Sequence, residues 1–230
     1  MEVQDKKEKA SEKYAKERRE EKRRKFIKTL FSRKVVLIST IGVVVFALVA
    51  VLAPFLAPYD PNKNSLMECL MGASLAHLFG TDNFGRDIFS RVIYGTRVSL
   101  VVGVIAVLFA CAIGTFFGMV AGFFGGIVDD VINRVSEAIR AIPQIVFAMA
   151  LCAVLKGGIV NIAIVLGISN VAVYIRMMRG QVLSIRESDY IMAGRLQGNG
   201  NFQLMFKHIL PNSISPIIVT MTQQIGQTIL

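Results

Sequence analysis

The polar side chains inside the apolar stretches of this chain are amides and hydroxyls, with no acid or histidine beside them. Ser169 lies in one such stretch, and the sequence offers no obvious base for it. An intramembrane enzyme would need a nucleophile with a base, or paired acids, at matching depth, so the pattern argues against catalysis. Amides instead suit contacts with a partner helix or with a watery path. The candidate residues of a translocation path are Asn161, Asn170, Gln223, Gln224 and Gln227.

Metal, redox and nucleotide chemistry have no support in the sequence either. Cys69, Cys111 and Cys152 show no CxxC spacing, which favours packing roles. His77 and His208 stand apart from other ligand types, so we expect no metal site. The chain has no GxxxxGK[ST] phosphate loop, so we expect it to bind no cofactor and to hydrolyse no nucleotide alone.

The composition is that of a membrane protein. The chain has 230 residues, of which 53% are apolar and 18% charged, against about 45–50% and about 25% in soluble domains. Residues 1–34 hold fourteen Lys and Arg against seven acids, hence +7 of the formal +10. No basic-aromatic motif follows this tail, so we expect no nucleic-acid partner. The tail suits a solvated arm that touches anionic lipid, and the first apolar run should stay as an anchor.

Apolar runs predict five membrane spans. The first is uncharged for about twenty residues, enough to cross a ~30 Å hydrocarbon core. Because the basic tail precedes it, the positive-inside rule puts the N-terminus in the cytoplasm. Counting the crossings from there makes residues 188–208 cytoplasmic. The predicted spans are 35–53, 98–120, 141–155, 157–175 and 209–230.

Two helical patterns lie between the spans. A glycine at every fourth position, at Gly114, Gly118, Gly122 and Gly126, predicts a helix face that a neighbouring backbone approaches closely. Residues 125–144 are amphipathic, and the short third span is expected to borrow its start from them. The apolar face carries Ile127, Val131, Val135, Ala138 and Ile142, and the charged face carries Asp130, Arg134, Glu137 and Arg140.

The segment SDYIMAGRLQGNGNFQLMFKHILPN, residues 188–212, predicts a short helix followed by a glycine turn. Ser188 or Asp189 is a fair N-cap, and Gly198 with Gly200 should stop the helix and turn the chain. Pro211 is tolerated in the first turn of the next span. On spacing alone, a plain connection between helices fits as well.

This segment resembles the EAA loop of inner-membrane permeases from bacterial ABC importers. Residues 192–194 (Met-Ala-Gly) stand at the Glu-Ala-Ala positions, Gly198 at the glycine, and Leu210 with Pro211 at the Leu-Pro. The first and third letters of the triplet differ. HLFGTDNFGRDIFSRVIYGTRVSL, residues 77–100, resembles the segment before the second span in dipeptide and oligopeptide permeases. GGIVDD and RMMRGQVLSIRESDY also match, so the likeness covers about residues 35–230.

The resemblance implies an all-α polytopic transmembrane helical bundle, similar to a type I ABC-importer permease of the C-subunit type. It divides the chain into a basic tail (1–34), a first transmembrane helix (35–56), an extracytoplasmic segment (57–97) and a permease core (98–230) with the EAA-like loop at 186–211. Ala193 and Gly194 would offer a small surface to the ATPase. The residues expected to couple to it are Ser188, Asp189, Tyr190, Ala193, Gly194, Gly198 and Pro211.

The implied function is uptake of di- or oligopeptides across the bacterial inner membrane, without enzymatic activity in this chain. The implied partners are a second permease, two ATP-binding cassette subunits that use ATP and Mg, an extracytoplasmic solute-binding protein and membrane lipid. Nickel and glutathione importers share these motifs and stay open as alternatives. A structural anchor would not explain the glycine-punctuated module. The family also implies a sixth span, so the chain is expected to be partial.

The segment GTDNFGRD allows two interpretations. Its Asp, Asn and Gly residues form turns readily, so it could be a loop that satisfies its own hydrogen bonds. It could also form an external lip near the docking position of a solute-binding protein. The candidate lip residues are Thr81, Asp82, Arg86 and Asp87.

Overall fold

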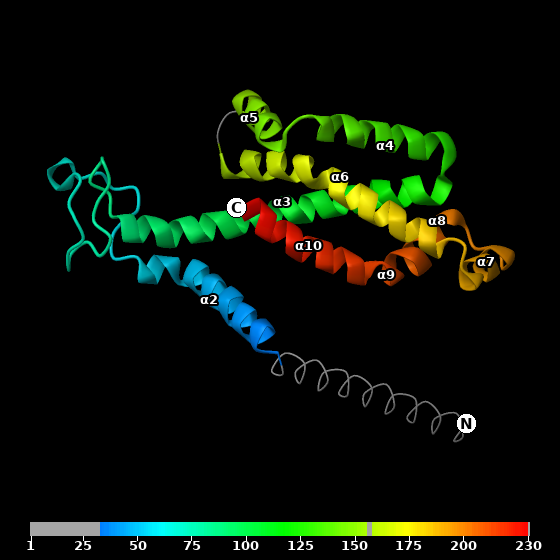
Figure 1. The fold of residues 1–230 in the computed structure, drawn as a ribbon, viewed down its shortest axis with the longest axis horizontal. Coiled ribbons are helices and arrows are strands. Elements are labelled where there is room, and N and C mark those ends of the chain that lie inside the picture. Colours follow the sequence, from blue (N-terminus) through cyan, green and yellow to red (C-terminus); the bar gives the residue numbers. More distant parts are fainter. Residues whose placement is uncertain (1–32, 156–157, 230) are drawn as a thin grey trace, which may run out of the picture. The chain divides into compact units, whose positions relative to one another are not determined.

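The computed structural model describes residues 33–155 and 158–229. Nearly all of the basic tail, and residues 156–157 where the third and fourth predicted spans meet, therefore lie outside the described residues. Across those residues the elements are helices, and strand pairing is limited to an isolated bridge between Thr81 and Asp87. This confirms the predicted all-α class. The chain divides after Thr96 into two compact units, each treated separately below (Figure 1).

The first unit contains the predicted first span. Helix α2 runs over Lys34–Leu56, with Pro54 inside its last turn. Most of its apolar side chains are exposed, as in a helix that faces lipid. Its 23 residues are long and apolar enough to cross a membrane.

The extracytoplasmic segment of the prediction is an ordered loop with the short helix η1 (Leu66–Glu68). The Ser65 N–H donates to the Phe84 carbonyl at 3.0 Å and closes the loop. Gly85 has φ +70, and a Cβ there would lie 1.7 Å from the Ser65 oxygen, so no other residue fits. Helix α3 follows at Ile88, ten residues before the predicted start of the second span.

The early start of α3 has a local cause. The carboxylate of Asp87 accepts the backbone N–H of Ser90 at 2.7 Å, which is the geometry of an N-cap. The sequence-based boundary followed the last charged residue, Arg97, but charged residues are tolerated in the water-exposed turns of a long helix. Helix α3 extends over Ile88–Phe124 and has 37 residues.

In the second unit, α3 packs closely on α6 (Ile159–Ile185). A Cβ on Gly114 would lie 2.5 Å from the Tyr174 Cβ, and one on Gly118 would lie 2.5 Å from the Ile175 oxygen. Gly122 likewise meets Val182 at 2.8 Å. The predicted glycine face is thus confirmed for these three residues. Gly126 was predicted wrongly, because nothing lies within 4 Å of its Cβ position.

Helices α4 (Gly126–Ala141) and α5 (Gln144–Leu155) pack along α6 (Figure 1). They do not form one straight span, as the prediction implied, but bend by 90°. Pro143 cannot donate a backbone hydrogen bond, and it holds Ile142 in an extended conformation with φ −87 and ψ 129. The amphipathic stretch therefore ends at Ala141 instead of continuing into the third span.

The predicted fifth span is also divided. Helix α8 (Asn201–Gln203), the π-helix η2 (Leu204–Ile209) and α9 (Leu210–Asn212) lead into α10 (Ile214–Ile229). The break falls at Ser213, since Pro216 cannot donate to the Asn212 carbonyl. In the described part of the chain, three helices can cross a membrane, or up to four if the bent α4–α5 pair counts as one span.

A buried cluster joins the helices of the second unit. It brings together side chains from α3, α6, α7 (Asp189–Leu196), η2 and α10. In Figure 1, α7 lies at the end of α6 that is remote from α5. The cluster contains Met119, Phe123, Met178, Val182, Ile191, Leu204, Met205, Ile209 and Ile217.

Candidate functional site

Helix α7 is the short helix that the sequence predicted before the glycine turn. Ser188 occupies its N-cap position, with φ −74 and ψ 148. Its hydroxyl donates to the Ile185 carbonyl at 2.6 Å, so the predicted side-chain cap is not formed. Asp189 begins the helix and places a negative charge in the first turn, where it interacts favourably with the positive end of the helix dipole.

The C-terminal end of α7 is a Schellman turn. The Gly198 N–H donates to the Arg195 carbonyl at 3.0 Å, and the Asn199 N–H donates to the Gly194 carbonyl at 3.1 Å. Gly198 has φ +82, as its predicted turn-forming role requires. The same prediction for Gly200 was wrong, because its φ of −66 is open to any residue.

One face of α7 is fixed to the protein core. Ile191 is fully buried in the cluster, and a Cβ on Gly194 would lie 2.9 Å from the Leu204 side chain. Gly194 is therefore small because it packs inward, which corrects the prediction that it faces a partner. The Asn212 amide donates to the Tyr190 hydroxyl at 3.2 Å and ties α7 to α9 as well.

The opposite face of α7 is open. Tyr190 is 45% exposed and Leu196 is 89% exposed, while Ala193 is also at the surface. These side chains, with Met192, form an apolar surface on a helix whose inner face packs against the core. Sequence reasoning missed Ile191, although its position three residues before Gly194 indicates a shared inner face.

An ion pair that the sequence analysis did not single out joins α4 to α6. The Arg179 Nε and Nη2 atoms donate to the two carboxylate oxygens of Asp129 at 2.5 and 2.6 Å. Asn133 also donates to Asp129, and the Arg186 guanidinium donates to the Gly122 carbonyl at 3.1 Å. Both partners of the pair lie in the matching motifs GGIVDD and RMMRG, which is a signal that could have revealed it.

The candidate path residues do not form one cluster. Asn161 donates to the Leu155 carbonyl at 2.7 Å, at the start of α6. Asn170 is 5% exposed and donates to the Leu166 carbonyl and to the Thr228 hydroxyl, so it links α6 to α10. The glutamines lie on α10, where Gln223 and Gln227 are exposed and Gln224 is partly buried. Their role in a path stays a prediction.

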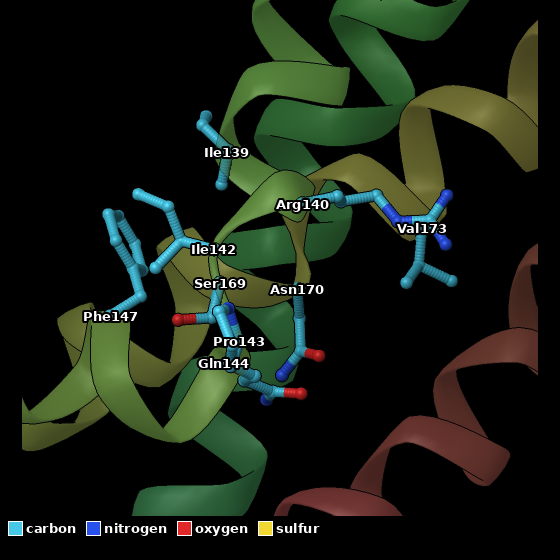
Figure 2. A pocket seen from close by; sticks show the side chains of 9 residues that line it. All are labelled: Ile139, Arg140, Ile142, Pro143, Gln144, Phe147, Ser169, Asn170 and Val173. Carbon is cyan, nitrogen blue, oxygen red and sulfur yellow. The ribbon is translucent and has the colours of Figure 1, made fainter.

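Asn170 also borders a cavity at the bend between α4 and α5. The cavity holds about 260 Å³. In Figure 2 the Arg140 side chain extends toward Val173, the amides of Gln144 and Asn170 lie below it, and Ile139, Ile142 and Phe147 lie on the left. The remaining lining residues are Pro143, Ser169 and Val173.

Each of the four candidate lip residues has hydrogen-bond partners within the first unit. Asp82 accepts the Arg86 guanidinium at 2.8 Å and also binds Arg91. Burial raises the pKa of Asp82, but the backbone N–H groups of Arg86 and Phe84 and the Arg86 guanidinium outweigh it and lower the pKa to about 2. The Thr81 hydroxyl bonds within the same loop.

The sequence suggested that His77 is isolated from other ligand types, but in the structure it has a carboxylate partner. Its Nδ1 lies 3.0 Å from the Asp87 carboxylate, and both side chains are buried. Burial raises the pKa of Asp87, but hydrogen bonds from Ser90 and the interaction with His77 lower it below its ordinary value. The His77–Asp87 pair and the contacts of Asp82 with Arg86 and Arg91 thus hold the loop itself together, so these polar side chains have a structural role within it.

Long apolar helices, a glycine-packed core and a short surface helix fixed to it define a polytopic permease-like membrane protein. Residues 114–230 match the family described as the binding-protein-dependent transport system inner membrane component. Residues 23–71 match the N-terminal transmembrane domain of oligopeptide transport permease C. The chain belongs to this family of ABC-importer permease subunits, which are transport components and not enzymes.

Individual relatives agree with this family. The chain is 41% identical over 207 residues to a dipeptide transport system permease protein of Alkalihalophilus pseudofirmus, covering 90% of this chain and 68% of the relative. An oligopeptide transport system permease protein of Bacillus subtilis is 36% identical, with 83% and 63% covered. A glutathione transport system permease protein of Pectobacterium atrosepticum is 34% identical, with 90% and 69% covered. The chain thus spans about two thirds of the length of these relatives.

Proposed function

We propose that this permease subunit carries di- or oligopeptides into the cell and that α7 couples it to an ATPase. The observation that carries the coupling role is the two-sided character of α7. Its inner face is fixed by Ile191 and Gly194, and its outer face exposes Tyr190, Ala193 and Leu196. A force on the outer face is therefore passed to α3, α6 and α10 through the buried cluster.

The peptide cargo is supported by the relatives named as dipeptide and oligopeptide permeases. A second candidate cargo is glutathione, which the name of the Pectobacterium relative favours. Both are small molecules with free carboxylates and amide bonds. Direct competition between peptides and glutathione for uptake distinguishes the two.

The proposed assembly contains this chain, a second permease, two ATP-binding cassette subunits and an extracytoplasmic solute-binding protein. The basic tail before α2 supports a cytoplasmic N-terminus. With that orientation, α7 lies on the side where ATP is hydrolysed. The lip loop then lies on the outer side, and because Asp82 and Asp87 are engaged internally, its docking role would use the loop's shape.

The test is uptake by the reconstituted importer. Proteoliposomes with this chain, its partner permease, the ATPase subunits and the solute-binding protein should accumulate a labelled tripeptide only when ATP is supplied on the α7 side. A Met192→Ala, Leu196→Ala variant, which changes exposed side chains of α7 and keeps the bond of Tyr190 to Asn212, should keep its membrane insertion but lose ATPase on co-purification. Unchanged ATPase recovery and transport in this variant would refute the coupling role of α7.

A further inference from the structure

The cavity at the α4–α5 bend is an open hollow beside the middle of α6. Its α6 wall is formed by Ser169, Asn170 and Val173, near the middle of a 27-residue helix. At 1.5 Å per residue, Ser169 lies roughly 15 Å from the start of α6, which is half the thickness of a ~30 Å hydrocarbon core. The other walls come from the end of α4 and the first turn of α5.

Arg140 brings a positive charge to this depth without a carboxylate partner. Across the residues that the structure describes, no Asp or Glu oxygen lies within 4.0 Å of its guanidinium. The acids on its own helix are engaged elsewhere or distant: Asp129 pairs with Arg179, and Glu137 lies 3.9 Å from Arg134. Arg140 is exposed, so at the depth of a membrane its charge needs water or an anionic ligand beside it, and an anion can reach it.

Of the other polar side chains that line the cavity, two already donate hydrogen bonds within the described part of the chain and one does not. The Ser169 hydroxyl donates to the Val165 carbonyl, and the Asn170 amide nitrogen already donates twice. No hydrogen bond of the Gln144 side chain occurs among the described residues, so its amide is available. Helix α5 begins at Gln144, and the positive end of its dipole adds to the charge of Arg140.

The cavity therefore suits the carboxylate end of a peptide cargo. The Arg140 guanidinium and the Gln144 amide both line the cavity and can donate to a carboxylate, and the apolar side chains of Ile139, Ile142 and Phe147 can contact a side chain next to it. Its volume of about 260 Å³ is below the range of about 300–1,000 Å³ for pockets that enclose a drug-sized ligand. The space is enough for one terminal residue and not for a whole peptide.

We infer that Arg140, assisted by Gln144, binds the C-terminal carboxylate of the peptide during its passage through this subunit. The inference rests on the proposed peptide cargo. It makes Arg140 a determinant of specificity inside the membrane, separate from the selection made by a solute-binding protein.

The experiment compares labelled Ala-Ala-Ala with its C-terminal amide in ATP-driven uptake by the reconstituted importer. Any preference of the solute-binding protein cancels, because the same protein serves every permease variant. For Arg140→Gln, uptake of the free acid relative to the amide should fall about tenfold, the value of one charge-assisted carboxylate contact. Arg134→Gln, on the same helix outside the cavity, is the matched control and should keep the wild-type ratio.

Each other outcome is decisive. A wild-type ratio in Arg140→Gln would overturn the inference and leave the peptide function standing. An equal loss of both peptides, or loss of the assembled complex, would also overturn it, since the partner of Arg140 would then be a carboxylate of another subunit. If the wild-type importer moves neither peptide, the proposed cargo itself is wrong.

Discussion

Replacement of Gly198 by valine tests whether the end of α7 must keep its shape. Gly198 has φ +82, and nothing lies within 4 Å of its Cβ position. The cost of a side chain is therefore conformational and involves no clash with a neighbour. A residue with a Cβ costs about 1–2 kcal/mol in the left-handed region, and a β-branched residue is at the upper end.

This cost falls on the Schellman turn and not on the buried cluster. If docking of the ATPase requires the intact turn, a strain of about 1–2 kcal/mol lowers the affinity by roughly 5- to 30-fold. Membrane insertion and expression should not change, because α3, α6 and α10 are untouched. Affinity is measured by titrating ATPase subunits onto the permease in lipid nanodiscs, together with ATP-driven uptake.

Gly200→Val is the matched control. Gly200 lies two residues further along, also has nothing within 4 Å of its Cβ position, and has φ −66 and ψ 156, which valine adopts readily. Its affinity should stay within about twofold of wild type. Equal effects of the two changes, or normal affinity in Gly198→Val, would refute the argument from the turn.

Three further predictions concern other parts of the chain. Asp129→Asn should destabilise the detergent-solubilised protein by about 1–3 kcal/mol, because it leaves the Arg179 guanidinium without its carboxylate. The charge-swapped double variant, Asp129→Arg with Arg179→Asp, should recover part of the lost melting temperature. If it recovers none, the ion pair is not the cause of the destabilisation. Gly118→Val should abolish folding or assembly, since its Cβ would lie 2.5 Å from a carbonyl oxygen of α6. Gly180→Ala, which adds a Cβ in open space on α6, should give a melting temperature at or above that of wild type. Equal melting temperatures for the two variants would contradict the close packing of α3 on α6. The folded-state pKa of Asp82 is about 2, below its ordinary 3.8. Its stabilisation of the lip loop is therefore present above pH 4 and is lost as the pH falls toward 2. Cleavage of the loop by an acid-active protease should rise over that window, and Asp82→Asn should reduce the pH dependence and leave the part due to Asp87, whose pKa is also lowered.

The helix packing was predictable where one residue type repeats at one spacing. Gly114, Gly118 and Gly122 face α6 because a four-residue step keeps them on one side of α3. Gly126 has the same spacing but lies beyond the end of that helix at Phe124, so the pattern continues only in the sequence. Periodicity shows which residues share a face but not where the helix stops.

The bend at Pro143 was also within reach of the sequence, although its angle was not. The pair Ile142–Pro143 disfavours helix, but many transmembrane helices pass through a proline with a modest kink. The 90° bend follows from the contacts that α4 and α5 each make with α6, and these are tertiary. The position of Arg140 beside the cavity also depends on these tertiary contacts, and the sequence pattern predicted only that Arg140 lies on a charged helix face.

For α7, the sequence predicted the helix and the turn after it but not which of its faces points into the protein. Gly194 seemed suited to a partner because it is small. The structure shows that Leu204, ten residues later, takes the space that a side chain would need. That contact depends on how η2 folds back on α7, which no local pattern encodes.

The glycine contacts between α3 and α6 restrict how this permease can move. A side chain in place of any of these glycines would meet backbone or Cβ atoms at 2.5–2.8 Å, so sliding one helix past the other would bring larger neighbours into the same gap. We therefore expect the two helices to move together, and under the proposed coupling role a displacement of α7 would shift both of them at once. The bend at Pro143, beside the cavity, lies outside these glycine contacts, so we expect any change of angle between helices to occur there before it occurs between α3 and α6.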